Sequence, residues 1–147
     1  MTISPETAIH FASTPESIAR CYAVMRELRP ALVSAEEFVA RVQQQQAEGF
    51  HLAFIERQGQ IVTVAGFRVQ HLLVSGLTLY VDDLVTADAF RSQGNGKAML
   101  DWLIAYARER GYDTFSLDSG THRREAHAFY FREDMRISSF HFVLPLK

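Results

Sequence analysis

The stretch that decides the fold is Arg91-Ser92-Gln93-Gly94-Asn95-Gly96-Lys97. Two glycines within three positions let the backbone turn sharply and approach a ligand closely. Directly after them, apolar residues recur at helical spacing, at Met99, Trp102, Leu103, Tyr106 and Ala107. The sequence therefore predicts a glycine-rich loop that opens a helix, where unpaired N–H groups and the helix dipole favour phosphate or pyrophosphate.

The segments on both sides of this helix are rich in β-branched and apolar residues. Residues 77–86 and 113–118 are predicted strands, and strands joined through a helix run parallel. Capping boxes that begin at Ser13 and Ser34 open two earlier helices, which end near Pro30 and Gly49. The remaining predicted elements are strands 7–11, 50–56, 60–73 and 136–144, and a helix at 121–132. The predicted order is β-α-α-β-β-β-α-β-α-β, an α/β (α+β) fold with a mixed sheet.

Length and composition indicate one globular domain over residues 1–147. Hydrophobic residues make up 48% and the formal net charge is −2, which favours neither nucleic acid nor an anionic membrane as a partner. Cys21, the only cysteine, lies on an apolar helical stripe, so it is expected to be an inert core residue rather than part of a disulfide or metal site. The sequence shows no secretory signal and no apolar stretch of about 18 residues, so a cytoplasmic location is expected.

Two other phosphate-binding motifs compete for the glycine stretch. A Walker loop fails because Ala98 stands where Ser or Thr is needed and Arg91 stands where the first glycine is needed. A dinucleotide fingerprint is a closer rival, since Asp118 follows the glycines by about 20 residues. However, Met99 occupies the third glycine position, and the loop after residue 86 is long. A dinucleotide-dependent oxidoreductase therefore remains only a third hypothesis.

Two motifs resemble one known family. Arg91-x-x-Gly94-x-Gly96 resembles the pyrophosphate-binding signature of the GNAT acetyltransferase superfamily, Gln/Arg-x-x-Gly-x-Gly/Ala. Arg123-x-x-Ala126-x-x-Phe129-Tyr130 resembles the later motif of that family, in which a helical tyrosine faces the CoA sulfur. The element order is similar as well. The resemblance implies a sheet whose two central parallel strands splay apart around acetyl-CoA, and acetyl transfer to a primary amine of a small molecule or peptide.

The resemblance also implies which residues bind the cofactor. The backbone of Leu84, Val85 and Thr86 would contact the pantetheine arm. The pyrophosphate would be held by the amides of Gln93, Gly94, Asn95, Gly96 and Lys97. The Arg91 and Lys97 side chains would be either supporting cations or ordinary solvated charges.

Direct attack on a thioester requires a neutral amine. A primary amine near pKa 10.4 is about 3 units from neutrality at physiological pH, or roughly 4 kcal/mol. Asp82 and Asp83 are the candidate bases, and strand alternation predicts that they point to opposite faces. Asp83 is favoured because related small-amine acetyltransferases carry a glutamate there, although it could instead orient the ammonium or be solvated. Tyr130 would protonate the leaving thiolate, unless it belongs to a buried aromatic cluster.

The sequence departs from the family pattern at two places. Asp134 precedes Met135 where many members have glycine, and Asp tolerates a left-handed backbone. Asp118-Ser119-Gly120 replaces an asparagine that contacts the cofactor in many members. A CoA-binding sensor or interaction module without catalysis is a second hypothesis, against which Tyr130 and the acidic strand argue. The identity of the acceptor amine is not encoded in these motifs, and the alternating apolar residues 137–144 are compatible with a homodimer.

Overall fold

The structure, a computed structural model, describes residues 8–147, and these form a first unit that ends at Ser116 and a second unit, Leu117–Lys147. The first unit contains β1 (Ile9–Phe11), α1 (Pro15–Arg20), α2 (Tyr22–Leu28), α3 (Ala35–Gln46), β2 (Phe50–Arg57), β3 (Gln60–Leu72), β4 (Gly76–Thr86), the 3-10 helix η1 (Asp88–Phe90) and α4 (Asn95–Glu109). It closes with β5 (Thr114–Leu117), whose last residue begins the second unit, and that unit contains α5 (Arg124–Arg132).

The strands form one five-stranded mixed sheet in the order β1-β2-β3-β4-β5. The pairs β1–β2, β2–β3 and β3–β4 are antiparallel. The starts of β4 and β5 lie together, because Asp113 N donates to Leu77 O at 2.8 Å and Asp113 Oδ2 accepts from Leu77 N at 2.9 Å. Two strands that begin next to each other at the same end of the sheet run in the same direction. This agrees with the βαβ unit that the sequence predicts.

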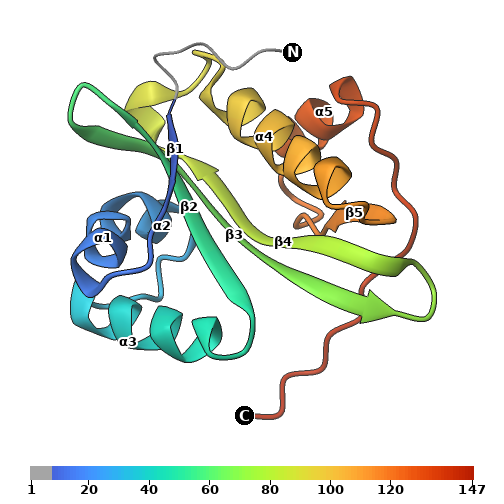
Figure 1. The fold of residues 1–147 in the computed structure, drawn as a ribbon, viewed down its shortest axis with the longest axis horizontal. Helices are drawn as coiled ribbons and strands as arrows, with labels where there is room; N and C mark the ends of the chain where they lie inside the picture. Colours follow the sequence, from blue (N-terminus) through green and yellow to red (C-terminus); the bar gives the residue numbers. More distant parts are fainter. Residues whose placement is uncertain (1–7) are drawn as a thin grey trace. The chain divides into compact units, whose positions relative to one another are not determined.

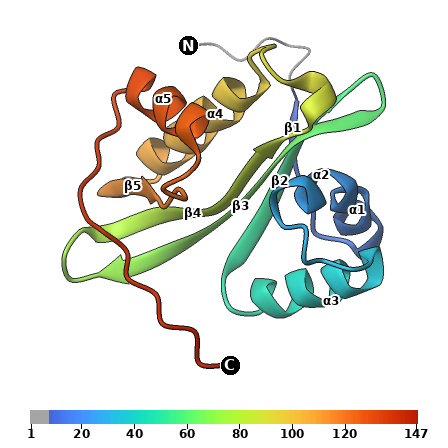
Figure 2. The same cartoon turned by 180° about the vertical axis from the view of Figure 1, so that it is seen from behind.

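Helices cover both faces of the sheet in the first unit (Figures 1 and 2). Helices α1, α2 and α3 lie on one face, where Ile18, Met25 and Phe38 join a buried cluster with strand residues such as Phe50 and Val85. Helix α4 lies on the other face and buries Met99, Leu100 and Leu103 completely. Among residues 8–147, no helix is both long and apolar enough to cross a membrane.

The first predicted helix is interrupted at Cys21. Its N-cap is Thr14 rather than Ser13, and the side chains of Thr14 and Ser17 cap each other's backbone N–H groups. Cys21 N bonds to Ile18 O at 2.9 Å, a tighter i−3 contact that separates α1 from α2. The Cys21 side chain is fully buried, and burial raises the pKa of its thiol to about 12. It is therefore the core residue that the apolar stripe predicts.

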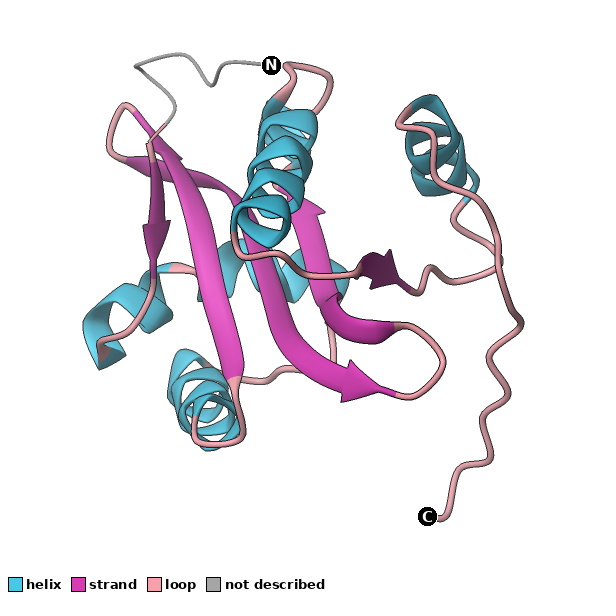
Figure 3. Cartoon of the chain, turned by 45° about the vertical axis from the view of Figure 1, so that its right-hand side comes forward, coloured by secondary structure: helices cyan, strands magenta, loops and turns pink. Residues whose placement is uncertain are grey.

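In the second unit, the structure confirms the turn expected at Asp134 but not the strand expected at 136–144. Asp134 adopts a left-handed backbone with φ of 62°, and Met135 N bonds back to Tyr130 O at 3.1 Å. The predicted strand at 136–144 is wrong, because residues 136–147 form no strand (Figure 3). Alternating apolar residues need a neighbouring strand to complete the hydrogen-bond ladder, and none of the described strands pairs with this segment. Exposed apolar side chains remain along it, at Ile137, Phe140, Phe142, Val143, Leu144 and Leu146.

Candidate active site

A β-bulge interrupts β4 at Asp82. Gly66 of β3 pairs with Asp83, but the next residue, Phe67, pairs with Val81. Asp82 is therefore an extra residue on β4, inserted where the register slips by one position. A bulge bends its strand and redirects the side chains beside it.

The bulge places both aspartates on the same face of the sheet. A Cβ built on Gly66 would collide with the Phe50 ring and lie 2.9 Å from Asp83 Oδ2. The Asp82 carboxylate binds Arg68, whose guanidinium lies 5.4 Å from the centroid of the same Phe50 ring. The prediction that Asp82 and Asp83 point to opposite faces is therefore wrong, since strict alternation fails at a bulge. We call Arg29, Phe50, Arg68, Asp82 and Asp83 the bulge cluster.

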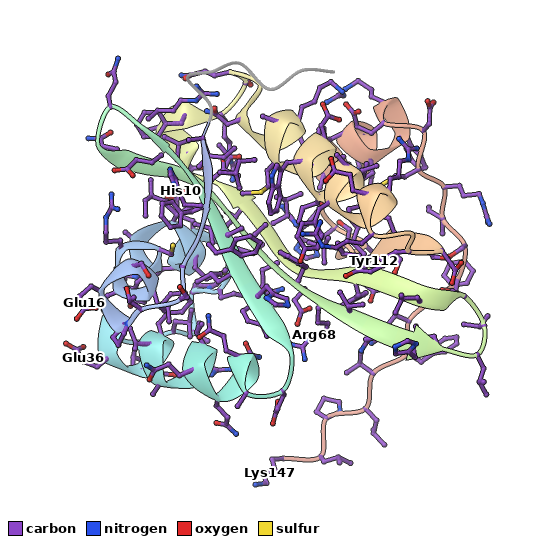
Figure 4. The ribbon with its side chains drawn as sticks, viewed as in Figure 1. His10, Glu16, Glu36, Arg68, Tyr112 and Lys147 are labelled. Atoms are coloured by element: carbon purple, nitrogen blue, oxygen red, sulfur yellow. The ribbon has the colours of Figure 1, made fainter. Side chains whose placement is uncertain are left out.

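Asp82 is held in a closed ion pair. Arg68, labelled on β3 in Figure 4, donates from Nε to Oδ1 at 3.0 Å and from Nη2 to Oδ2 at 2.6 Å. Both side chains are only 21% exposed. The pair raises the pKa of the Arg68 guanidinium. Since Asp82 is bound by a two-point contact with a partly buried cation, it is poorly placed to accept a proton from a substrate.

Asp83 is held in a more open pair with Arg29. Arg29 Nε donates to Asp83 Oδ1 at 2.8 Å, and Arg29 Nη2 donates to the backbone oxygen of Asp82 at 3.0 Å. The Asp83 side chain is 16% exposed, whereas that of Arg29 is 51% exposed. Burial raises the pKa of Asp83, and Arg29 opposes this effect without cancelling it. Asp83 is thus a stronger base than an ordinary aspartate.

Local sequence brings Arg29 to this place. Arg29 is the C-cap of α2, and Pro30 follows it, which disfavours a helical backbone at residue 29. Its φ of −120° and ψ of 73° turn the chain out of the helix. The hydroxyl of Tyr22 then donates to Leu32 O at 3.1 Å, and Leu32 N donates to Arg29 O at 3.1 Å. These bonds fix the short segment that carries the guanidinium.

Residues 91–97, the glycine loop, open α4 as the sequence predicts. Gly94 is the N-cap, with a φ of 83° that non-glycine residues rarely adopt. Gly94 O accepts the first helical hydrogen bond, from Ala98 N at 3.0 Å. The N–H groups of Asn95 and Gly96 precede that bond, so they have no partner inside the helix. Together with the dipole of a 15-residue helix, they suit an anion such as a pyrophosphate.

The Asn95 side chain holds the loop from inside the protein. It is 1% exposed, and its Oδ1 accepts from Arg57 Nε at 2.6 Å. Its Nδ2 donates to Phe90 O at 3.3 Å, so it joins the end of β2 to the segment that precedes the loop. The sequence predicts a backbone contact with the cofactor here, but it does not reveal this second role of the side chain.

The other residues expected to bind the cofactor continue from the bulge to the loop. Leu84, Val85 and Thr86 complete β4 beyond Asp83, and the Thr86 hydroxyl lies 2.9 Å from that of Thr63. Arg91 pairs with Asp88 at 3.0 Å and Lys97 pairs with Asp101 at 3.5 Å. Both cations are substantially exposed, and exposed pairs of this kind contribute little to stability. Gln93 is exposed at the tip of the loop.

Tyr130 lies on α5 in the second unit. It is half-buried, and its ring centroid is 5.3 Å from that of Phe129. Burial raises the pKa of the Tyr130 hydroxyl, and the charge of Arg123 opposes this shift. A hydroxyl with a raised pKa stays protonated through the neutral range. Tyr130 can therefore act as a proton donor there.

Sequence reasoning missed Arg29, Phe50 and Arg68 of the bulge cluster. These residues come from α2, β2 and β3, and no motif links them along the chain. The one local signal is the Arg29-Pro30 pair, which marks a helix end but not a site. The cluster depends on the register slip at Gly66, which sequence periodicity does not reveal.

Comparison with known proteins identifies the family. The model of the Acetyltransferase (GNAT) family matches residues 18–133, which include the bulge, the glycine loop and Tyr130. An uncharacterized N-acetyltransferase, YhdJ, from Bacillus subtilis is 34% identical over 119 residues, which make up 80% of this chain and 83% of that protein. An aminoalkylphosphonate N-acetyltransferase from Salmonella typhimurium is 31% identical over 97 residues, 65% of this chain and 63% of the relative.

A solved structure shows the same fold. Aminoglycoside N-acetyltransferase AAC(6')-Iy, in complex with CoA, superposes with a TM-score of 0.80 over 98% of both chains at 11% identity. At that identity the likeness concerns the fold alone. The resemblance noted in the sequence and the predicted mixed α/β fold class are thus confirmed. The chain belongs to the GNAT family of acetyltransferases and is an enzyme of the N-acetyltransferase class.

Proposed function

We propose that this enzyme transfers the acetyl group of acetyl-CoA directly to a primary amine of a small molecule or peptide. The observation that carries the proposal is Asp83, a mostly buried carboxylate with a raised pKa at the β4 bulge. It lies three residues or fewer from Leu84, Val85 and Thr86, which lead toward the glycine loop. The relative named for aminoalkylphosphonates supports an acceptor that is a small amine.

The glycine loop fits the pyrophosphate of acetyl-CoA. The amides of Gln93, Gly94, Asn95, Gly96 and Lys97 would hold it, with Arg91 and Lys97 as supporting cations. The left-handed backbone at Gly94 and the start of the helix dipole favour a close approach of phosphate oxygens. The backbone of Leu84, Val85 and Thr86 would hold the pantetheine arm. Acetyl-CoA supplies the activated thioester.

Asp83 would take the proton from the acceptor amine, directly or through a water molecule. In the described part of the chain, Arg29 bonds Oδ1 of this carboxylate, so Oδ2 can accept from a substrate ammonium. A raised pKa brings the base closer to the operating pH, which makes general-base catalysis more efficient. Asp82 is unsuited to this role because Arg68 binds both of its oxygens.

Tyr130 would return a proton to the leaving group. As the amine nitrogen bonds to the acetyl carbon, the carbon–sulfur bond breaks and CoA leaves as a thiolate. The Tyr130 hydroxyl is protonated at neutral pH, as an ordinary tyrosine is, and burial raises its pKa further. It would donate its proton to that sulfur. An acceptor that arrives as an ammonium loses two protons, the first to Asp83 before attack and the second after the carbon–nitrogen bond forms. One proton ends on the CoA sulfur and the other passes to solvent, so the reaction is balanced.

A thermal-shift comparison of acetyl-CoA, CoA and NAD, followed by a turnover assay on a panel of amines, tests the proposal. Ligand at about 100 times its Kd stabilises a protein by roughly 2.7 kcal/mol. For a chain of this length, that corresponds to a rise in Tm of roughly 5–10 °C. We expect a shift with both CoA species but not NAD, and acetylation of at least one amine.

Each of the other outcomes would support a different function or contradict the proposed one. A shift with CoA but no turnover on any amine would support a CoA-binding module without catalysis. A shift with NAD alone would support the hypothesis of a dinucleotide-dependent oxidoreductase. No shift with any of the three ligands would contradict the proposed cofactor site.

A further inference from the structure

The two arginines of the bulge cluster are held very differently. Arg68 donates to both oxygens of Asp82, lies over the Phe50 ring and is only 21% exposed. Arg29 donates to one oxygen of Asp83 and to one backbone carbonyl, and it is 51% exposed. A guanidinium carries five N–H donors in a rigid fork. Arg29 therefore has donors directed to solvent beside the carboxylate that would receive the amine.

The charges in the cluster constrain what can bind beside Asp83. Arg68 with Asp82, and Arg29 with Asp83, form two neutral pairs. A substrate ammonium that approaches Asp83 also approaches the positive charge of Arg29, which lies 2.8 Å from Asp83 Oδ1. A simple cationic amine would therefore meet attraction and repulsion at the same place. An acceptor with a negative group near its amine would satisfy both charges.

The geometry also limits how far apart these two groups can be. Arg29 and Asp83 are in direct contact, so the amine and the anion must be joined by a short chain. Guanidinium groups bind carboxylates, phosphonates and phosphates through paired hydrogen bonds, which adds specificity as well as affinity. A peptide lysine, an amino sugar without an acidic group, or a polyamine would leave the exposed face of Arg29 unused.

We propose that the acceptor is a small zwitterion, a primary amine that carries a carboxylate, phosphonate or phosphate a few bonds away, and that Arg29 binds this anionic group. The proposal rests on the proposed function and names its substrate class. Asp83 would bind the amine end and Arg29 the anionic end. Arg68 and Asp82 would support the site as a closed pair.

Matched acceptors test the idea. The kcat/KM of the enzyme is measured with β-alanine against β-alanine amide, and with 2-aminoethylphosphonate against its dimethyl ester. We expect the anionic member of at least one pair to be favoured at least tenfold. Because Arg29 also pairs with Asp83, Arg29→Ala should change the turnover of both acceptors. The ratio of their kcat/KM values should fall to about one, mainly through a higher KM for the anionic acceptor. Arg26→Ala, an exposed arginine on the same helix, is the control and should leave the preference intact.

The outcomes separate this proposal from the proposed function. If acetyl-CoA binds and neutral amines react as well as anionic ones, or Arg29→Ala keeps the preference, the zwitterion proposal is overturned and the acetyltransferase function stands. If no amine reacts, both fail. The acetyl-CoA thermal shift of Arg29→Ala should match that of the wild type, which shows that the variant is folded.

Discussion

The glycine loop and the bulge cluster flank the same stretch of β4, yet they are encoded in opposite ways. The loop is seven consecutive residues, and its shape follows from local properties such as the left-handed backbone of Gly94. The cluster gathers side chains from α2, β2, β3 and β4, and it forms only because the register slips at Gly66. A cofactor site of the first kind is visible in a sequence, whereas an acceptor site of the second kind is visible only in the fold.

The largest effect should come from removing the carboxylate of the open pair. Asp83→Asn should lower kcat/KM for the amine by about 10²–10³-fold, because general-base catalysis contributes on that order. The Kd for acetyl-CoA should not change. Asp82→Asn is the matched control, one residue away in the closed pair, and it should cost mainly stability. Equal losses of turnover in the two variants would remove the distinction between the pairs.

The pH dependence of stability and of kcat/KM gives a second test of the role of Asp83. Burial raises the folded-state pKa of Asp83 above its unfolded value. Its contribution to stability is therefore fully present below the unfolded pKa and is lost as pH rises through the folded pKa. The free energy of unfolding of the wild type should fall relative to Asp83→Asn across that window. The acidic limb of kcat/KM should lie above the ordinary aspartate value of about 3.9. A limb at or below that value would contradict a role for Asp83 as base.

The next effect concerns Tyr130, which belongs to neither region and lies in the second unit. Tyr130→Phe should lower kcat by roughly 10–100-fold at neutral pH, since it removes the proposed proton donor. The KM for acetyl-CoA should change little. Tyr106→Phe, which removes a hydroxyl from the aromatic cluster on α4, serves as the control. Unchanged kcat in Tyr130→Phe would assign this tyrosine to packing with Phe129 alone.

A smaller effect is expected in the glycine loop. Gly94→Ala forces a side chain into a left-handed backbone, at a cost of about 1–2 kcal/mol. If the loop must hold that shape to bind pyrophosphate, the Kd for acetyl-CoA should weaken by about tenfold. Gly111→Ala has a similar φ of 71° with open space around it, and it should lose comparable stability without changing the Kd. Isothermal titration of both variants distinguishes loop shape from general strain.

The smallest effect on cofactor binding should come from Asn95→Ala. Loss of its buried hydrogen bonds to Arg57 and Phe90 should destabilise the protein by roughly 1–3 kcal/mol. The KM for acetyl-CoA should rise by several-fold while kcat is unchanged. Thr114→Val, which removes a hydrogen bond to Ser75 O elsewhere in the first unit, should leave that KM as it is. An unchanged KM in Asn95→Ala would show that the loop keeps its shape without this side chain.

Local chemistry explains which features could be predicted from the sequence. The glycine loop, the helix after it and the left-handed turn at Asp134 follow from nearby residues. The opposite-face assignment of Asp82 and Asp83 was wrong because alternation assumes an unbroken ladder. The strand expected at 136–144 was wrong because a strand also needs a partner, which its own sequence does not supply. Arg29 could not be found because its role depends on a contact 54 residues along the chain.

The most direct test of the account measures acetyl-CoA affinity and amine turnover together in the wild type, Asp83→Asn and Gly94→Ala. We predict that each variant loses a different one of these two properties. Asp83→Asn should bind acetyl-CoA normally and lose turnover, whereas Gly94→Ala should bind acetyl-CoA weakly and recover most of its turnover when acetyl-CoA is saturating. If both variants lose acetyl-CoA affinity to the same extent, or both lose turnover at saturating acetyl-CoA to the same extent, the separation between the glycine loop and the bulge cluster is contradicted.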